Sequence, residues 1–113
     1  MEEPVSLRRY AREALKIHRE LAEKNPDAYL PDLAISCNNL ANLLSDIGSF
    51  KEAEELYQEA LKIRRNLAEE NPKVYLPKLQ LVCDNLTALL EKTGRREEAD
   101  NLRREVAEFF KLQ

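Results

Sequence analysis

A short run of residues decides the fold of this chain, because Cys37-Asn-Asn-Leu-Ala-Asn-Leu-Leu44 returns as Cys83-Asp-Asn-Leu-Thr-Ala-Leu-Leu90. The two runs lie 46 positions apart, and the same offset relates Glu13-Ala-Leu-Lys-Ile17 to Glu59-Ala-Leu-Lys-Ile63. Further matches at this offset include prolines and glycines, and no gap is needed between the copies. Self-similarity at one fixed period is the signature of a repeat architecture. The sequence therefore contains a true duplication.

Prolines and glycines divide the repeated unit into two helices, which we call A and B. Pro31 and Pro77 suit the first turn of a helix, where a missing N–H costs nothing. The first A helix is predicted to run from Pro31 to about Ile47. It should stop at Gly48, because glycine can take the left-handed conformation of a C-terminal cap.

The B helix is predicted to begin near Phe50 and to run to about Glu70. Asn71 precedes Pro72, and a residue before proline avoids helical geometry. Residues 71–76 are therefore expected to form a short link to the next A helix.

The predicted organisation is one all-α domain over residues 1–113. Residues 4–24 match a B helix alone and form a half repeat, and complete repeats are expected at 31–70 and 77–112. The five helices follow the order B, A–B, A–B. A lone hairpin cannot bury its apolar stripes, so the hairpins must stack into a solenoid with one continuous core.

Each predicted A helix carries one apolar stripe when its residues are placed at about 100° intervals. The stripe of the first A helix contains Leu33, Cys37, Leu40, Leu43, Leu44 and Ile47. The stripe of the second contains Leu79, Cys83, Leu86, Leu89 and Leu90. The B helix has a broader stripe, as expected if it covers its own A helix and that of the next unit.

The composition favours helices and argues against two classes of partner. Charged residues make up 35% of the chain, and its formal net charge of -3 creates no field that would attract nucleic acid. No apolar run approaches the roughly 20 residues needed to cross a bilayer. The first residues do not resemble a secretory signal. We therefore expect a cytoplasmic protein that binds neither nucleic acid nor membrane.

Few residues could carry chemistry. Cys37 and Cys83 occupy the same slot in adjacent repeats, so their helices should lie near 10 Å apart, whereas a disulfide needs Cα atoms within about 7 Å. We expect two buried free thiols. His18 is the only histidine, and no zinc-ligand spacing, nucleophile elbow or phosphate loop accompanies it. The sequence predicts no metal, no cofactor and no enzyme.

The repeated unit resembles the tetratricopeptide repeat family. The helix–turn–helix signature of that family is matched by Cys37, Leu40-Ala41, Leu44, Gly48, Phe50, Ala53, Tyr57 and Ala60. The same stretch looks especially like the longer repeats of kinesin light chains and of many prokaryotic signalling proteins. The period of 46 departs from the common period of about 34, and we assign the difference to a longer B helix. In the second copy, Arg103 and Val106 replace the expected aromatic residue and alanine.

The resemblance implies a right-handed superhelix whose A helices line a concave groove for a peptide or helix of a partner protein. Carried over by position, the groove residues are Ile35, Asn38, Asn42 and Ser45, followed by Leu81, Asp84, Ala88 and Glu91. Asn39 and Asn85 match an asparagine that hydrogen-bonds the ligand backbone in related repeats. In the alternative interpretation, these two side chains satisfy polar groups inside the stack.

Two features refine the expected ligand. Ile35 and Leu81 interrupt the polar face at equivalent positions and form a small apolar strip. Asp84 and Glu91 make the second repeat mildly acidic, partly offset by Lys92, which favours a basic or amphipathic segment.

A second function stays open beside protein binding. The first B helix lacks an A partner, so its stripe of Leu7, Ala11, Ala14, Ile17 and Leu21 would be exposed. Such an end favours self-assembly into a homo-oligomer, either symmetrically or head to tail.

Overall fold

The computed structural model describes the backbone of residues 3–113 and the side chains from Ser6 onward; Met1 and Glu2, where the predicted domain starts, lie outside the described residues. Five helices follow one another: α1 (Glu3–Lys24), α2 (Pro26–Asp46), α3 (Phe50–Glu70), α4 (Pro72–Lys92) and α5 (Arg96–Leu112). No β-strand occurs between Glu3 and Gln113. The predicted all-α fold is confirmed, with α1, α3 and α5 as B helices and α2 and α4 as A helices.

The A helices begin earlier than predicted. Pro26 and Pro72 occupy their first positions, so Pro31 lies inside α2 and Pro77 lies inside α4. The predicted link at residues 71–76 is therefore wrong. Each B helix is separated from the following A helix by a single asparagine. This residue is Asn25 in the first junction, with φ of -145°, and Asn71 in the second, with φ of -142°.

Hydrogen bonding explains why one residue suffices as a junction. The Asn71 N–H donates to the Leu67 carbonyl at 2.8 Å and closes α3, while the Asn71 carbonyl accepts from Tyr75 at 3.1 Å and opens α4. In the first junction, the Asn25 side chain also accepts from the Ala28 N–H at 3.3 Å, as asparagine does at helix starts. The following proline needs no acceptor for its nitrogen.

The long period is shared between the two helices of the unit. Both α2 and α3 contain 21 residues, so the assignment of the extra length to the B helix alone is wrong. The error follows from the misplaced start of α2, because residues counted as link belong to the A helix.

The turn from A to B has the predicted left-handed glycine. Gly48 has φ of 85° and Gly94 has φ of 79°. The Ser49 N–H donates to the Leu44 carbonyl at 2.8 Å, and the Gly48 N–H donates to the Ser45 carbonyl at 3.1 Å. These two bonds define a Schellman motif, which satisfies the last carbonyls of the helix. In the second repeat, the Arg95 N–H likewise donates to the Leu90 carbonyl at 2.7 Å.

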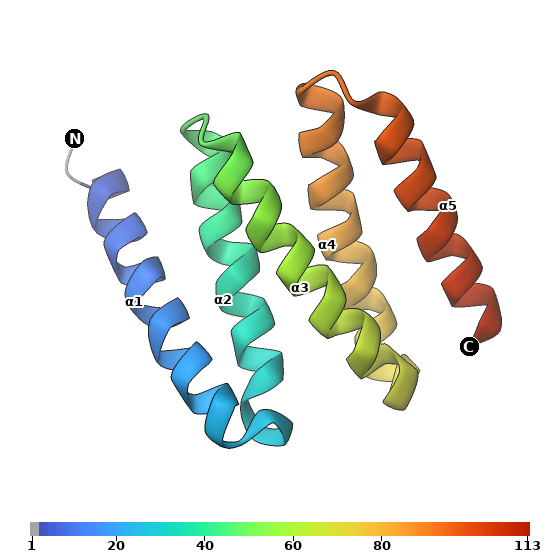
Figure 1. Ribbon diagram of the computed structural model, residues 1–113, viewed down its shortest axis with the longest axis horizontal. Coiled ribbons are helices and arrows are strands. Elements are labelled where there is room, and N and C mark those ends of the chain that lie inside the picture. The colour runs from blue at the N-terminus through green and yellow to red at the C-terminus, as the bar shows by residue number, and fades with distance from the viewer. Residues whose placement is uncertain (1–2) are drawn as a thin grey trace.

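The helices stand side by side in chain order, with α3 in front of α2 and α4 in the view of Figure 1. Each helix packs on the next, and α2 also contacts α4. The result is a flat stack with extents of 45 × 38 × 17 Å. Helices α2 and α4 are therefore each covered by B helices on two sides.

The core runs continuously through this stack. Its fully buried members include Cys37, Leu40 and Ala41 of α2, together with Val82, Cys83 and Leu86 of α4. Small residues of the B helices, such as Ala53 and Ala60, are also fully buried and allow close approach. All predicted stripe residues of α4 are buried. In α2, Leu43 is half-buried and Ile47 is exposed, because Ile47 already belongs to the turn.

Both cysteines are buried and free, as predicted. Burial raises the pKa of Cys37 to about 12, with a further contribution from nearby Glu59. Burial likewise raises the pKa of Cys83 to about 11. Both thiols therefore stay protonated at neutral pH and pack as small apolar groups.

Candidate functional site

The A helices expose apolar side chains in a line along the molecule's open side. On α4, Val74, Leu81 and Ala88 are exposed at a spacing of seven residues, which places them on one side of the helix. Ile35 of α2 is equivalent to Leu81, and the two are 42% and 52% exposed. We call the surface formed by these residues and their polar neighbours the A-face.

Val74 was missed by the sequence analysis. It is 45% exposed and extends the apolar strip by two turns beyond Leu81. The reason is the misplaced helix start, since Val74 fell in the predicted link. The Asn71–Pro72 pair at the junction is the signal that would have placed it on α4.

Asn38 does not lie on the open face, although the prediction placed it there. Its side chain is buried, and its Oδ1 accepts a hydrogen bond from Nδ2 of Asn85 at 3.1 Å. Asn85 is half-buried, whereas its equivalent Asn39 is exposed. This contact joins the two A helices and gives Asn85 the role inside the stack that the alternative interpretation proposed. Asn39 alone presents a free-standing carboxamide to solvent on this face.

Asn42 of α2 and Ser45 of α2 are both half-buried. The Tyr57 hydroxyl donates to Oδ1 of Asn42. Burial raises the pKa of Tyr57 to about 12, with Asp46 contributing further, so the hydroxyl keeps its proton and remains a donor. Asn42 therefore forms a hydrogen bond between the two helices of the first hairpin and shows only part of its side chain to the A-face.

The predicted acidic groups of the second repeat are both exposed but differ in their partners. Glu91 forms an ion pair with Arg103 at 3.0 Å. Asp84 accepts a hydrogen bond from the Gln80 amide at 2.8 Å and has no cationic partner among the described residues. Lys92 lies over the Phe50 ring, 5.8 Å from its centroid. The charge available at this end of the A-face is thus concentrated on Asp84.

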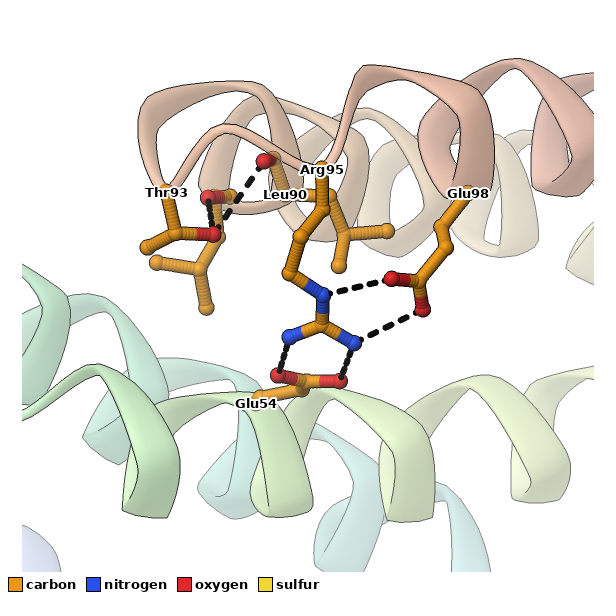
Figure 2. A network of polar contacts seen from close by, with 6 residues as sticks. Glu54, Leu90, Thr93, Arg95 and Glu98 are labelled. Atoms are coloured by element: carbon orange, nitrogen blue, oxygen red, sulfur yellow. Dashed lines mark hydrogen bonds and ion pairs between the residues drawn. The ribbon is translucent and has the colours of Figure 1, made fainter.

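A polar network fixes the turn that leads into α5. Arg95 binds both oxygens of Glu54 from α3 and both oxygens of Glu98 from α5, as Figure 2 shows. The hydroxyl of Thr93 donates to carbonyls of the last turn of α4, at 3.0 and 3.1 Å. These contacts raise the pKa of Arg95, with Glu98 as the largest cause, and lower the pKa of Glu98. The network thus links the turn before α5 to α3 of the preceding repeat.

A cleft of about 490 Å³ opens at the far end of the first hairpin. It lies between the first turns of α2, the last turns of α3 and Tyr75 of α4. Its lining residues are Pro26, Asp27, Leu30, Pro31, Ile63, Asn66, Leu67, Glu70, Asn71 and Tyr75. Some of its lining residues belong to the first turns of α2 and α4, which begin earlier than predicted, so the sequence analysis did not foresee the cleft.

Comparison with known families decides what kind of repeat this is. Residues 33–72 match the model of the tetratricopeptide repeat. The chain carries a tetratricopeptide repeat. The match covers α2 from Leu33, the glycine turn, α3 and the start of α4. Searches of curated proteins and of solved structures gave no significant match.

Tetratricopeptide repeats generally serve as protein–protein interaction modules. The special likeness to kinesin light chain repeats stays a prediction. Among the described residues, no group of three His, Cys, Asp or Glu side chains is arranged to hold a metal ion. Within residues 3–113, the apolar stretches of the helices are too short for any of them to traverse a bilayer.

Proposed function

We propose that the A-face binds an amphipathic segment of a partner protein, in the shallow groove of a right-handed superhelix. The observation that carries the proposal is the exposed apolar line of Val74, Leu81 and Ala88 on α4, with Ile35 in register on α2. Single exposed apolar residues are ordinary. A line of them on neighbouring helices suits the apolar face of a bound helix, which meets a groove through residues at i, i+3, i+4 and i+7.

Polar groups beside the line supply specificity. The exposed carboxamide of Asn39 offers a donor and an acceptor to a ligand backbone. Asp84 offers an unpaired carboxylate, which supports a ligand with a basic residue near its end. Because only two A helices contribute, we expect modest affinity, with a Kd of roughly 1–100 μM.

Tetratricopeptide repeats are usually not catalytic, and we propose that this chain is likewise not an enzyme. A cytoplasmic location is also part of the proposal, since reducing compartments keep thiols such as those of Cys37 and Cys83 free.

The test is a selection of peptides from a displayed library, followed by titration of the best peptides against the chain. Leu81→Asp places a charge in the middle of the apolar line and should weaken binding by about tenfold or more. Leu112→Asp is the matched control, because Leu112 is 81% exposed on α5, away from the A-face. Peptides that bind Leu81→Asp as tightly as the native chain would refute the groove.

One observation favours a second candidate function, self-assembly through the helical end. Leu7, Tyr10 and Ile17 of α1 are all exposed. Light scattering after size exclusion, over a wide range of concentration, tests this candidate. A mass that rises with concentration supports it, and a constant monomer mass removes it.

A further inference from the structure

Helix α1 exposes a face that its counterpart in the next repeat buries. Leu7 is 49% exposed, whereas its equivalent Ala53 is fully buried. Tyr10 is 69% exposed, whereas its equivalent Leu56 is 6% exposed. Leu7 and Tyr10 are three residues apart and Tyr10 and Ile17 are seven apart, which places all three on one side of α1. We call this surface the end face.

The end face is free of the arginines of α1 that pair with the next B helix. Arg12 binds Glu52 at 2.7 Å, and Arg19 binds Glu59 at 2.5 Å. Both partners belong to α3, so these arginines point away from the Leu7–Ile17 side. The apolar residues Leu7, Tyr10 and Ile17 therefore lie away from these two positive charges, and exposed Glu13 lies at their border.

The duplication itself shows what such a face binds. Helix α3 packs on two A helices, its own partner α2 and the following α4. Helix α1 packs on α2 in the way that α3 packs on α4, but within the described residues nothing stands in the place that α2 has against α3. The vacant place is therefore that of an A-type helix.

Asn39 supports the same conclusion independently. Asn85 donates to Oδ1 of Asn38 on the preceding A helix. Asn39 is the equivalent of Asn85, and it is exposed on the side of α2 where a preceding A helix would lie. A helix in that place would need an acceptor at the position of Asn38 to complete the same bond.

We propose that the end face binds one amphipathic α-helix of a partner protein, built like α2. This helix spans about 20 residues, presents an apolar stripe at the positions of Leu33, Cys37, Leu40 and Leu44, and carries an amide or carboxylate oxygen at the position of Asn38. A second folded copy fits less well. Both of its A helices are already covered by B helices, so its ends offer only B helices.

One substitution between the repeats sharpens the specificity. Ala11 stands in α1 where α3 has Tyr57, whose hydroxyl donates to Asn42. The bound helix therefore meets no hydroxyl donor at the position of Asn42, and it meets extra space. A large apolar residue there is favoured over asparagine, because a buried carboxamide without a partner costs free energy.

The chain provides its own probe for this site. A fluorescent peptide with the sequence of residues 26–47 is titrated against the intact chain under reducing conditions, with anisotropy as the readout. We expect saturable 1:1 binding and a gain of helical circular dichroism, since so short a peptide is largely unfolded alone. The peptide does not displace the chain's own α2, because that helix is tethered at high effective concentration.

Variants of the chain separate the end face from the A-face. Tyr10→Asp should weaken peptide binding by about tenfold or more, and it should leave the fold intact because Tyr10 is largely exposed. Leu81→Asp should leave peptide binding unchanged. In the peptide, Asn42→Leu should tighten binding by about fivefold.

Three outcomes would overturn the proposal. The first is the absence of saturable peptide binding, and the second is binding that Tyr10→Asp does not weaken. The third is a stable dimer that Tyr10→Asp dissociates, which would make a second copy the occupant. Loss of binding by Leu81→Asp but not by Tyr10→Asp is a form of the second outcome and would move the peptide to the A-face.

Discussion

The hydrogen bond between Asn85 and Asn38 arises from a one-position offset between the repeats. Alignment of the repeats pairs Asn85 with Asn39, yet Asn85 donates its hydrogen bond to Asn38, the residue before Asn39. A helical wheel treats one helix at a time and so places Asn38 outside. It contains no information on which flank of α2 meets which flank of α4, and this packing decides that Asn38 is buried.

Truncation of Asn85 and of its equivalent Asn39 to alanine should lower the free energy of unfolding by different amounts. Asn85→Ala removes the donor from the buried Oδ1 of Asn38 and should lower the free energy of unfolding by about 1–3 kcal/mol. Asn39→Ala, at the matching exposed position, should change it by less than about 0.5 kcal/mol. Urea denaturation followed by circular dichroism measures both. Equal costs would show that the carboxamide pair contributes nothing to the stack.

Helix boundaries show where the sequence suffices and where it does not. The glycine turn and the bounds of α3 follow directly from the pattern, because Gly48 and the Asn71–Pro72 pair each allow one solution. The start of α2 does not follow, since Pro26 and Pro31 both suit a first turn. Packing of the extra turn against the neighbouring helices selects Pro26, and Pro31 is tolerated inside the helix at the cost of one hydrogen bond.

The ambiguous start of the A helices also limited which residues of the candidate site could be predicted. The apolar strip at Ile35 and Leu81 was predictable, because both break a polar face in the same register. Val74 was not, because its helical state depended on the choice between two prolines. The sequence thus predicted the centre of this exposed apolar strip, and Val74 at its edge was missed.

A proline pair offers a direct test of this account. Pro77→Ala should raise the free energy of unfolding by about 1–3 kcal/mol, because it restores an interior N–H donor and removes a ring clash. Pro72→Ala, at the first position of α4, should be nearly neutral. Thermal and urea denaturation report the difference. A destabilised Pro77→Ala chain would mean that the proline ring makes a contact worth more than the restored hydrogen bond.

At the scale of the whole molecule, stability should vary along the stack. Helix α1 packs on α2 and α5 packs on α4, whereas the inner helices have neighbours on both sides. Terminal units of repeat stacks open at lower cost. We expect amide hydrogens of α1 and α5 to exchange at least about tenfold faster than those of α2 and α4, as measured by mass spectrometry. Uniform protection would indicate a single cooperative unit.

Alkaline pH should unfold the chain through its buried acids. Folding raises the pKa of Cys37 to about 12, of Cys83 to about 11 and of Tyr57 to about 12. Groups whose pKa is raised on folding stabilise the native state below their unfolded pKa, and this contribution is lost as pH rises toward the folded pKa. The urea midpoint should therefore fall between about pH 9 and pH 12.

Tyr57→Phe is the control for this alkaline transition. The variant lacks the tyrosine hydroxyl, so its urea midpoint should fall less steeply above about pH 10 than that of the native chain. Parallel profiles for the two chains would exclude Tyr57 from the transition and leave it to the thiols.

The one-residue junctions have a consequence for inheritance. The segment from Pro26 to Asn71 starts just after one asparagine junction and ends on the next, so its 46 codons form a closed module. Tandem copying of that stretch of a gene would add a complete hairpin and recreate both junctions, with no new linker to be selected. Lengthening by whole modules is then the simplest mutation open to this sequence, and shortening by fractions of a module is the most damaging.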